Sequence, residues 1–179
     1  SNDRLVRLVN DLLEIARSDA GKLQVAVVPI SLEPNINSVI HEIKPLADEK
    51  NITLKYESKK TLPQILADEQ RVKEVLTNFI SNAIKYNHTG GWVKISHEIK
   101  SDKVTTHIAD NGFGLSKADQ QHMFEKFYRS DAKENKNITG TGLGLFITKE
   151  LIEKMGGQLS FKSQKNKGST FSFSLRRTK

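Results

Sequence analysis

Hydrophobic positions switch along this chain between helical and strand spacing. A wide apolar stripe with helical spacing occupies residues 3–20 and ends before Gly21, a residue type that commonly terminates helices. Helical spacing returns at residues 36–43, 68–86, 117–123 and 143–155. Strand-like patterns mark residues 23–27, 52–56, 65–66, 92–100, 103–109, 158–163 and 169–176. Because these elements mix without strict alternation, they predict a single α+β layer sandwich.

The N-terminal stripe is open to two interpretations. Leu5, Leu8, Leu12 and Ile15 lie on it at helical spacing. A stripe at a chain end can pack in a coiled coil or bundle with another chain, or fold back on the core of its own domain. The pattern alone favours neither interpretation.

The predicted helix at residues 68–86 has two distinct faces. Its apolar positions follow i, i+3, i+4, i+7 spacing, so the opposite face gathers Glu74, Asn78, Asn82 and Lys85. Asparagine is a mediocre helix former. An amide oxygen, however, is a hard ligand for Mg²⁺, and a lysine is a point charge suited to phosphate. This face is therefore either a metal and phosphate site or an ordinary solvated surface.

Two loops are rich in glycine. Residues 110–114, Asp-Asn-Gly-Phe-Gly, end a strand, where a carboxylate can accept a hydrogen bond from an exocyclic amine and glycines let a flat ligand approach. The same residues also suit a plain turn. Residues 140–145, Gly-Thr-Gly-Leu-Gly-Leu, open the last helix, where backbone N–H groups and the helix dipole favour phosphate. We interpret this second loop as an anion site in preference to a simple cap.

Composition narrows the class of protein. The length of 179 residues and the hydrophobic fraction of 36% suit one globular domain with a core. The net charge is +7. The lysines are spread without a dense run, so no specific nucleic-acid site is expected. The absence of cysteine excludes disulfides and thiolate zinc sites. No apolar run approaches the roughly 20 residues of a membrane helix, so no direct membrane contact is expected in this segment.

Taken together, the motifs resemble the histidine-kinase branch of the ATPase superfamily that includes DNA gyrase, the MutL repair proteins and heat-shock chaperones. Four family boxes occur in family order, at residues 74–86, 110–114, 123–129 and 140–145. The resemblance covers about residues 23–175. It implies a Bergerat-type ATP-binding fold, in which a mixed, mainly antiparallel sheet packs on three helices, here preceded by one N-terminal helix.

The resemblance also implies roles for the polar residues of the first two boxes. Asn82 is the expected ligand of Mg²⁺, with Asn78 supporting the metal and the phosphates. Lys85 is expected to contact phosphate and Tyr86 to line the nucleotide. Asp110 is expected to read the adenine amine.

The remaining boxes supply the expected lid and further nucleotide contacts. Residues 130–139 are the expected mobile lid, and Arg129 is expected to steady the γ-phosphate, which makes Asn78, Lys85 and Arg129 the expected catalytic set. Phe124 and Phe127 suit either lid coupling or core packing. The further expected nucleotide-binding residues are Gly112, Gly114, Phe127, Gly140, Thr141, Gly142, Leu143, Gly144 and Thr170.

One position separates the branches of this superfamily. Relatives that hydrolyse ATP carry a glutamate one turn before the metal-binding asparagine, whereas this chain has Asn78, which cannot accept a proton. The sequence therefore predicts bound ATP kept for another nucleophile, as in a protein-histidine kinase. The alternatives are an ATP-hydrolysing machine, a kinase for protein serine, and a nucleotide sensor without turnover.

The expected phosphate acceptor lies outside this sequence. His41 begins a His-Glu-Ile-Lys-Pro-Leu run similar to the family's acceptor box, but the run lacks its threonine and follows the strand pattern at 23–27. Residues 1–21 are then expected to be the C-terminal part of a dimerisation helix with its linker, and residues 22–179 the catalytic domain. Expected partners are the phosphoacceptor domain of the same chain, a second protomer and a response regulator, in the cytoplasmic part of a membrane-bound sensor.

Overall fold

A mixed five-stranded sheet forms the centre of the computed structural model, which describes residues 2–58 and 61–179. Strand β2 runs parallel to β4, and every other neighbouring pair is antiparallel, which confirms the predicted mixed sheet. The spatial order is β2 (Thr53–Tyr56), β4 (Trp92–Ile99), β5 (Lys103–Asp110), β7 (Gly168–Arg176) and β6 (Gln158–Gln164).

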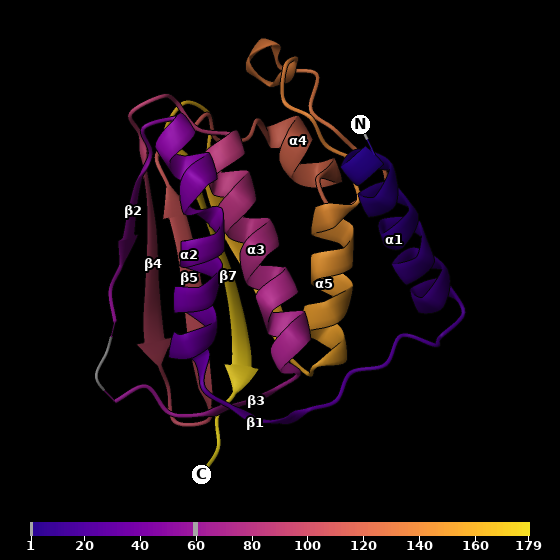
Figure 1. The fold of residues 1–179 in the computed structure, drawn as a ribbon, viewed down its shortest axis with the longest axis vertical. Coiled ribbons are helices and arrows are strands. Elements are labelled where there is room, and N and C mark those ends of the chain that lie inside the picture. The colour runs from indigo at the N-terminus through magenta and orange to yellow at the C-terminus, as the bar shows by residue number, and fades with distance from the viewer. Residues whose placement is uncertain (1, 59–60) are drawn as a thin grey trace.

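Three helices cover one face of this sheet and leave the other face to solvent. They are α2 (Leu32–Glu49), α3 (Glu69–Lys85) and α5 (Gly144–Lys154), which lie side by side in Figure 1. Strand β5 shows why the layers form: Val104, Thr106 and Ile108 are buried, while the residues between them are only half-buried. This period of two places one face of the sheet against the helices.

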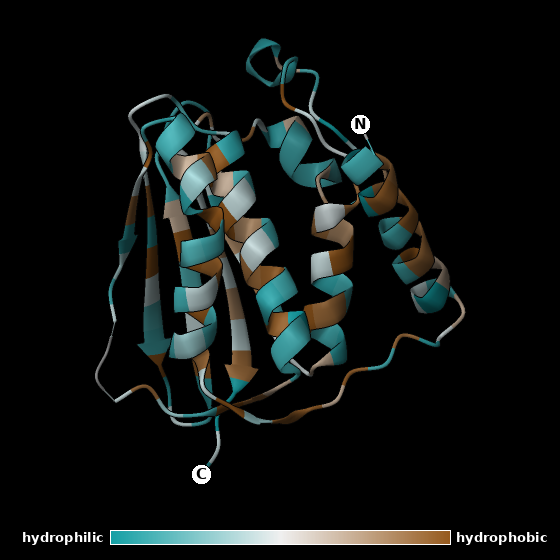
Figure 2. Cartoon of the chain, viewed as in Figure 1, coloured by the Kyte–Doolittle hydropathy of each residue, from teal (hydrophilic) through white to brown (hydrophobic). Residues whose placement is uncertain are grey.

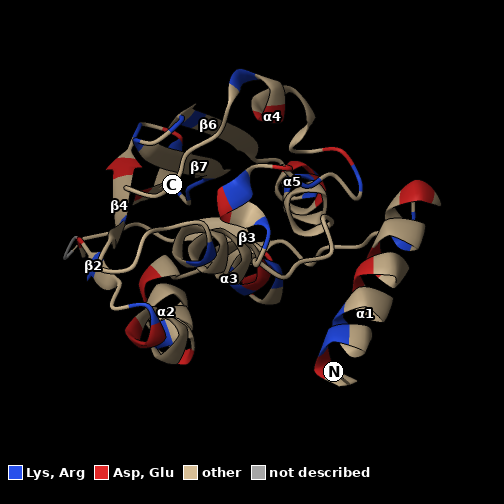
Figure 3. Ribbon diagram, turned by 90° about the horizontal axis from the view of Figure 1, so that it is seen from above, with Lys and Arg blue, Asp and Glu red and all other residues tan. Residues whose placement is uncertain are grey.

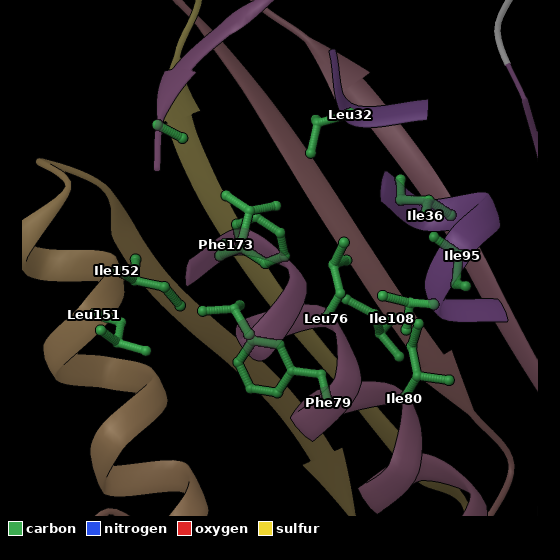
Figure 4. Close-up of a cluster of buried hydrophobic side chains, with 14 of the residues drawn as sticks. Leu32, Ile36, Leu76, Phe79, Ile80, Ile95, Ile108, Leu151, Ile152 and Phe173 are labelled. Carbon is green, nitrogen blue, oxygen red and sulfur yellow. The ribbon is translucent and has the colours of Figure 1, made fainter. Parts of the chain in front are cut away.

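The core lies between the three helices and the sheet, as Figure 4 shows. The Phe79 ring of α3 stacks on Phe173 of β7, with ring centroids 6.2 Å apart. Leu76 and Ile80, on the same face of α3, are fully buried. Truncation of a buried phenylalanine such as Phe79 to alanine is expected to cost about 3–5 kcal/mol of stability.

The start of α3 is fixed by its N-cap. Asp68 accepts hydrogen bonds from the backbone N–H groups of Gln70 and Arg71 at 3.1 and 3.2 Å. Its other carboxylate oxygen accepts from the N–H of Ala26 at 2.9 Å. The cap thus satisfies two orphan donors of the helix and also ties down the chain that leads out of the N-terminal helix.

The first predicted strand is displaced along the chain. Residues 23–27 are not a strand; instead β1 (Val28–Ile30) pairs antiparallel with β3 (Ile65–Ala67) as a separate two-stranded sheet. The alternation at 23–27 has another cause, because Leu23 is buried in the core while the segment crosses the surface in extended form. The smaller elements are α4 (Lys117–His122) and a 3-10 turn at Lys133–Asn135.

Helix α1 (Asn2–Asp19) lies beside α5, outside the three helices on the sheet (Figure 1). One edge folds back on the domain, because Ile15 is buried and Leu8 packs against the core. Hydrophobic residues nevertheless remain visible along the helix (Figure 2), and those exposed are Leu5, Val6, Val9, Leu12 and Leu13. The fold-back interpretation of the stripe is thus confirmed for this edge of the helix, and packing with another chain stays a prediction for the exposed residues.

One histidine lies inside the fold. His97 is buried in β4, where its ring bonds to the hydroxyls of Thr106 (3.1 Å) and Tyr56 (3.3 Å). The pattern of β4 explains this, because His97 continues the inward set of Val93 and Ile95. Within residues 2–58 and 61–179, no helix is long and apolar enough to cross a membrane.

Candidate active site

A cavity of about 840 Å³ opens where α3 ends and α5 begins. The end of β5, residues 130–139 and the N-terminal half of α1 complete its walls. Eleven of the residues predicted from sequence line it: Asn78, Asn82, Lys85, Tyr86, Asp110, Gly114, Arg129, Gly140, Thr141, Gly142 and Gly144. The fold therefore brings residues of all four motifs to one site.

The polar face of α3 forms one wall. The Asn78 amide nitrogen donates to the Thr148 hydroxyl of α5 at 2.5 Å, which fixes the amide and leaves its oxygen beside Gly144. The Asn82 side chain lines the cavity and makes no hydrogen bond to any other described residue. Burial, and secondarily the Arg7 guanidinium, lower the pKa of Lys85. The wall thus offers amide oxygens and a cation that an anion would stabilise.

Lys50 holds the end of this wall in place. Its ammonium group donates to three backbone carbonyls at the C-terminal end of α3, those of Ile84 (3.1 Å), Lys85 (2.8 Å) and Asn87 (2.9 Å). These acceptors are carbonyls that a helix end leaves without partners. Lys50 therefore positions Lys85 and Tyr86, and the sequence pattern of α2 gave no sign of that task.

Asp110 stands at the end of β5 as a half-buried carboxylate. It accepts hydrogen bonds from the N–H groups of Gly112 (2.8 Å) and Ser169 (3.3 Å). Burial outweighs these two bonds and raises the pKa of Asp110 to about 6. A desolvated carboxylate that faces a cavity gains from any ligand N–H that donates to it.

Glycines, which have no side chain, let the loops lie very close to neighbouring parts of the chain. Gly142 has a positive φ of 75°, and a Cβ on it would lie 2.7 Å from the backbone carbon of Phe127. A Cβ on Gly144 would lie 2.6 Å from the amide oxygen of Asn78. The start of α5 can therefore lie directly against α3, which leaves its first N–H groups beside the polar face.

The phenylalanine box divides into a packed and an exposed half. Phe124 packs edge-on against Phe161 of β6, with ring centroids 5.8 Å apart. Phe127 is 58% exposed with a positive φ of 64°. The Arg129 guanidinium donates to the backbone carbonyl of Ile138, which ties it to the lid segment. Phe124 therefore packs against the sheet, and the backbone of Phe127 lies beside Gly142 of the second glycine-rich loop.

Four predicted ligand-binding residues do not line the cavity: Gly112, Phe127, Leu143 and Thr170. The prediction for Thr170 is displaced by one residue along β7, because Thr170 lies opposite Ala109, on the sheet face away from the helices. Its neighbours Ser169 and Phe171 line the cavity instead. Successive strand residues point to opposite faces, so a shift by one residue moves a side chain out of a site.

Several lining residues escaped the sequence analysis. Thr148 lies one turn into α5, where a single threonine carries no distinctive pattern. Asp3, Arg4, Arg7 and Asp11 come from α1 and line the cavity by tertiary docking. Arg7 follows Arg4 by three residues and Asp3 by four, and Asp11 follows Arg7 by four, so these residues share one side of α1. The sequence does not indicate which element that side packs against.

The residues present fit a nucleotide with a divalent cation. The volume lies within the roughly 300–1,000 Å³ typical of ligand pockets. Among the lining residues, Asp110 offers an acceptor for an amine, while Lys85 and the glycine-bearing start of α5 suit phosphate. Among the described residues no three His, Cys, Asp or Glu side chains cluster as a metal site. Amide oxygens are hard ligands, so those of Asn82 and Asn78, together with ligand phosphates, could hold a hard cation.

Comparison with known proteins points the same way. Residues 67–179 match the family described as histidine kinase-, DNA gyrase B-, and HSP90-like ATPases. The signal transduction histidine-protein kinase BarA of Escherichia coli (strain K12) is 32% identical over 180 residues, covering 98% of this chain and 20% of BarA. The chain thus spans about a fifth of the length of this relative.

Solved structures share the fold. Full-length ShkA, crystallised in complex with AMPPNP, has a TM-score of 0.87 and 32% identity over 99% of this chain and 37% of that one. Histidine kinase ThkA, crystallised with the response regulator TrrA, has a TM-score of 0.77 and 23% identity over 99% of this chain and 49% of ThkA. The likeness to ThkA concerns the fold alone.

Proposed function

This chain belongs to the family of histidine kinase-, DNA gyrase B- and HSP90-like ATPases, and on that premise we propose that it supplies the phosphoryl-transfer site of a sensor histidine kinase. In this proposal the γ-phosphoryl group of Mg-ATP passes to a histidine of a dimerisation domain outside residues 1–179. The observation that carries the proposal is Asn78, a neutral amide fixed by Thr148 where a hydrolase would need a base.

Different lining residues bind different parts of the nucleotide. Asp110 accepts a hydrogen bond from the exocyclic amine of adenine, and Lys85 contacts the phosphates. Asn82 ligates the metal with support from Asn78, and Arg129 approaches the γ-phosphate once its lid segment moves. The bound Mg²⁺ supplies neutralising charge to the phosphate oxygens.

The lack of a base decides between transfer and hydrolysis. An amide takes no proton from water, so Asn78 gives water no activation in the cavity. Its bond to Thr148 further commits the amide nitrogen to the protein. ATP held in this cavity is therefore preserved until a better nucleophile, an imidazole, enters from outside.

Residues 1–21 are proposed to be the C-terminal part of a dimerisation helix with its linker, ahead of a catalytic domain at 22–179, and α1 lies within them. Its exposed residues Leu5, Val9 and Leu12 suit a bundle with a second protomer. BarA, 32% identical to this chain, is a signal transduction histidine-protein kinase, and we infer a response regulator as partner for the parent of this chain. Because ATP is the donor, we place this segment in the cytoplasm.

His41 is excluded from the proposed transfer. It is an exposed residue of α2 and does not line the cavity. Helix α3 lies between α2 and α5 in Figure 1, so the start of α5 is remote from it. Incubation of residues 1–179 with Mg-ATP should leave His41 without phosphate, as mass spectrometry under neutral conditions would show.

Calorimetry with Asn82→Ala tests nucleotide binding at this site. The variant should lose Mg-ATP binding, because it removes a metal ligand, while Asn37→Ala on the exposed side of α2 should bind as the unaltered chain does. Removal of Mg²⁺ should weaken binding by the unaltered chain much more than binding by Asn82→Ala. Undiminished Mg-ATP affinity in Asn82→Ala would refute the assignment.

A further inference from the structure

Helix α1 contributes a charged wall to the nucleotide cavity. Asp3, Arg7 and Asp11 succeed one another at four-residue spacing, so they share one side of the helix, and all three line the cavity. Figure 3 views this end of the molecule from above and shows both signs of charge along α1. The nucleotide site thus includes side chains from a helix outside the catalytic fold.

Four contacts hold α1 in this position. The Asp11 carboxylate accepts from the Thr141 hydroxyl of the glycine loop at 3.0 Å. Further along α1, Glu14 pairs with Arg71 of α3 at 3.3 Å. The last turn adds two bonds, Ser18 to Glu150 (2.5 Å) and Lys126 to Asp19 (2.8 Å). Arg7 lies one turn before Asp11, so its approach to the cavity is set by these contacts.

The cations around the cavity are not equally available. Arg129 donates to the backbone carbonyl of Ile138, whereas Arg4 and Arg7 line the cavity from α1. Neither of these two α1 arginines has an ion pair among the described residues, but only the charge of Arg7 acts on Lys85. Within the described part of the chain, Arg7 makes neither a salt bridge nor a hydrogen bond through its guanidinium. Its guanidinium N–H groups therefore line the cavity without a hydrogen-bond acceptor among the described residues.

Arg7 also acts on Lys85 across the cavity. Its positive charge contributes, after burial, to the lowered pKa of the Lys85 ammonium. Two like charges that face one half-enclosed space repel each other, and an anion between them converts that repulsion into attraction on both sides. A phosphate is such an anion, and guanidinium binds it in bidentate fashion.

We propose that Arg7 is a phosphate-binding residue of the nucleotide site, so that α1 closes over the phosphate chain and bound nucleotide in turn strengthens the docking of α1. This inference rests on the proposed nucleotide site and names a ligand residue outside the four family boxes. The reciprocity follows from linkage: if docked α1 tightens nucleotide binding, nucleotide tightens docking by the same factor. The stability with which α1 docks therefore depends on whether the site holds a nucleotide phosphate.

Arg7→Gln tests the contact, with Arg17→Gln as the matched control. Arg17 lies on the same helix, but it does not line the cavity. Loss of a hydrogen-bonded charge should raise the ATP dissociation constant of Arg7→Gln by about 10- to 100-fold. Adenosine, which lacks phosphate, should bind both variants and the unaltered chain equally in NMR titrations. Arg7→Lys, which keeps the charge without the guanidinium, should fall between.

A second readout follows the helix itself. Saturating Mg-ATP should slow amide hydrogen exchange across α1 in the unaltered chain and in Arg17→Gln, but not in Arg7→Gln. Equal ATP affinity in Arg7→Gln and the unaltered chain would overturn this inference alone. So would weakened adenosine binding, because it would indicate a distorted pocket. Failure of the unaltered chain to bind ATP would instead refute the proposed function.

Discussion

Replacement of Asp110 by asparagine is predicted to stabilise the fold and to weaken ATP binding. Burial raises the pKa of Asp110 from 3.8 to about 6, so the folded protein holds this proton more tightly than the unfolded chain does. For this group alone, the free energy of unfolding is therefore highest below pH 3.8. It falls as the pH rises to about 6 and then stays constant.

The size of this effect follows from the shift. A change from 3.8 to about 6 corresponds to about 3 kcal/mol of lost stability above pH 6. Asparagine carries no charge, and its oxygen can still accept from the N–H of Gly112. The hydrogen bonds of a neutral amide are weaker than those of a carboxylate, which lowers the free energy of unfolding by about 1 kcal/mol. Asp110→Asn should therefore be about 2 kcal/mol more stable than the unaltered chain at pH 8. The difference should shrink as the pH falls from 6 towards 4.

Binding should change in the opposite direction. The carboxylate accepts from the adenine amine, and loss of such a charge-assisted bond costs about 1.5–3 kcal/mol, or about 10- to 150-fold in ATP affinity. Inosine triphosphate has a carbonyl in place of that amine, so Asp110→Asn, whose amide can donate, should prefer it to ATP. Asp102→Asn, at an exposed turn, should change neither property.

Urea denaturation at pH 4 to 8 and calorimetry with both nucleotides measure these effects. An Asp110→Asn variant that keeps its preference for ATP would refute the view that the carboxylate reads the amine. A variant less stable than the unaltered chain at pH 8 would refute the account of its burial.

Two further substitutions test how the site is held together. Lys50→Met removes three hydrogen bonds from the end of α3 and should lower the free energy of unfolding in urea by about 2 kcal/mol, whereas exposed Lys55→Met should not. Thr148→Val leaves the Asn78 amide nitrogen without its partner, so it should cost about 1–3 kcal/mol of stability and weaken Mg-ATP binding several-fold in calorimetry. Unchanged binding in Thr148→Val would show that Asn78 needs no positioning.

Local periodicity predicted much of the fold and of the site. The unbroken apolar spacing of α3 was enough to place Asn78, Asn82 and Lys85 on one face, because helical geometry is local. Strand residues were harder to place: Thr170 was assigned to the site although Ser169 occupies it, since a period of two makes a one-residue error a change of face.

Contacts between distant segments were not predictable from pattern. The bonds from Lys50 to the end of α3, and the docking of Arg7 and Asp11 at the cavity, join residues far apart in the chain. A lysine or arginine on a helix surface looks the same in sequence whether it faces solvent or a carbonyl.

The destination of the γ-phosphate of ATP tests the central claim most directly. The full-length protein that carries this chain, incubated with Mg-ATP labelled on that phosphate, should gain label that is labile in acid and stable in base, as phosphohistidine is. The label should vanish with Asn82→Ala and persist with His41→Gln. Residues 1–179 alone should bind Mg-ATP, take up no label and release phosphate slowly. Rapid ATP turnover by residues 1–179, or acid-stable label on serine, would contradict the account.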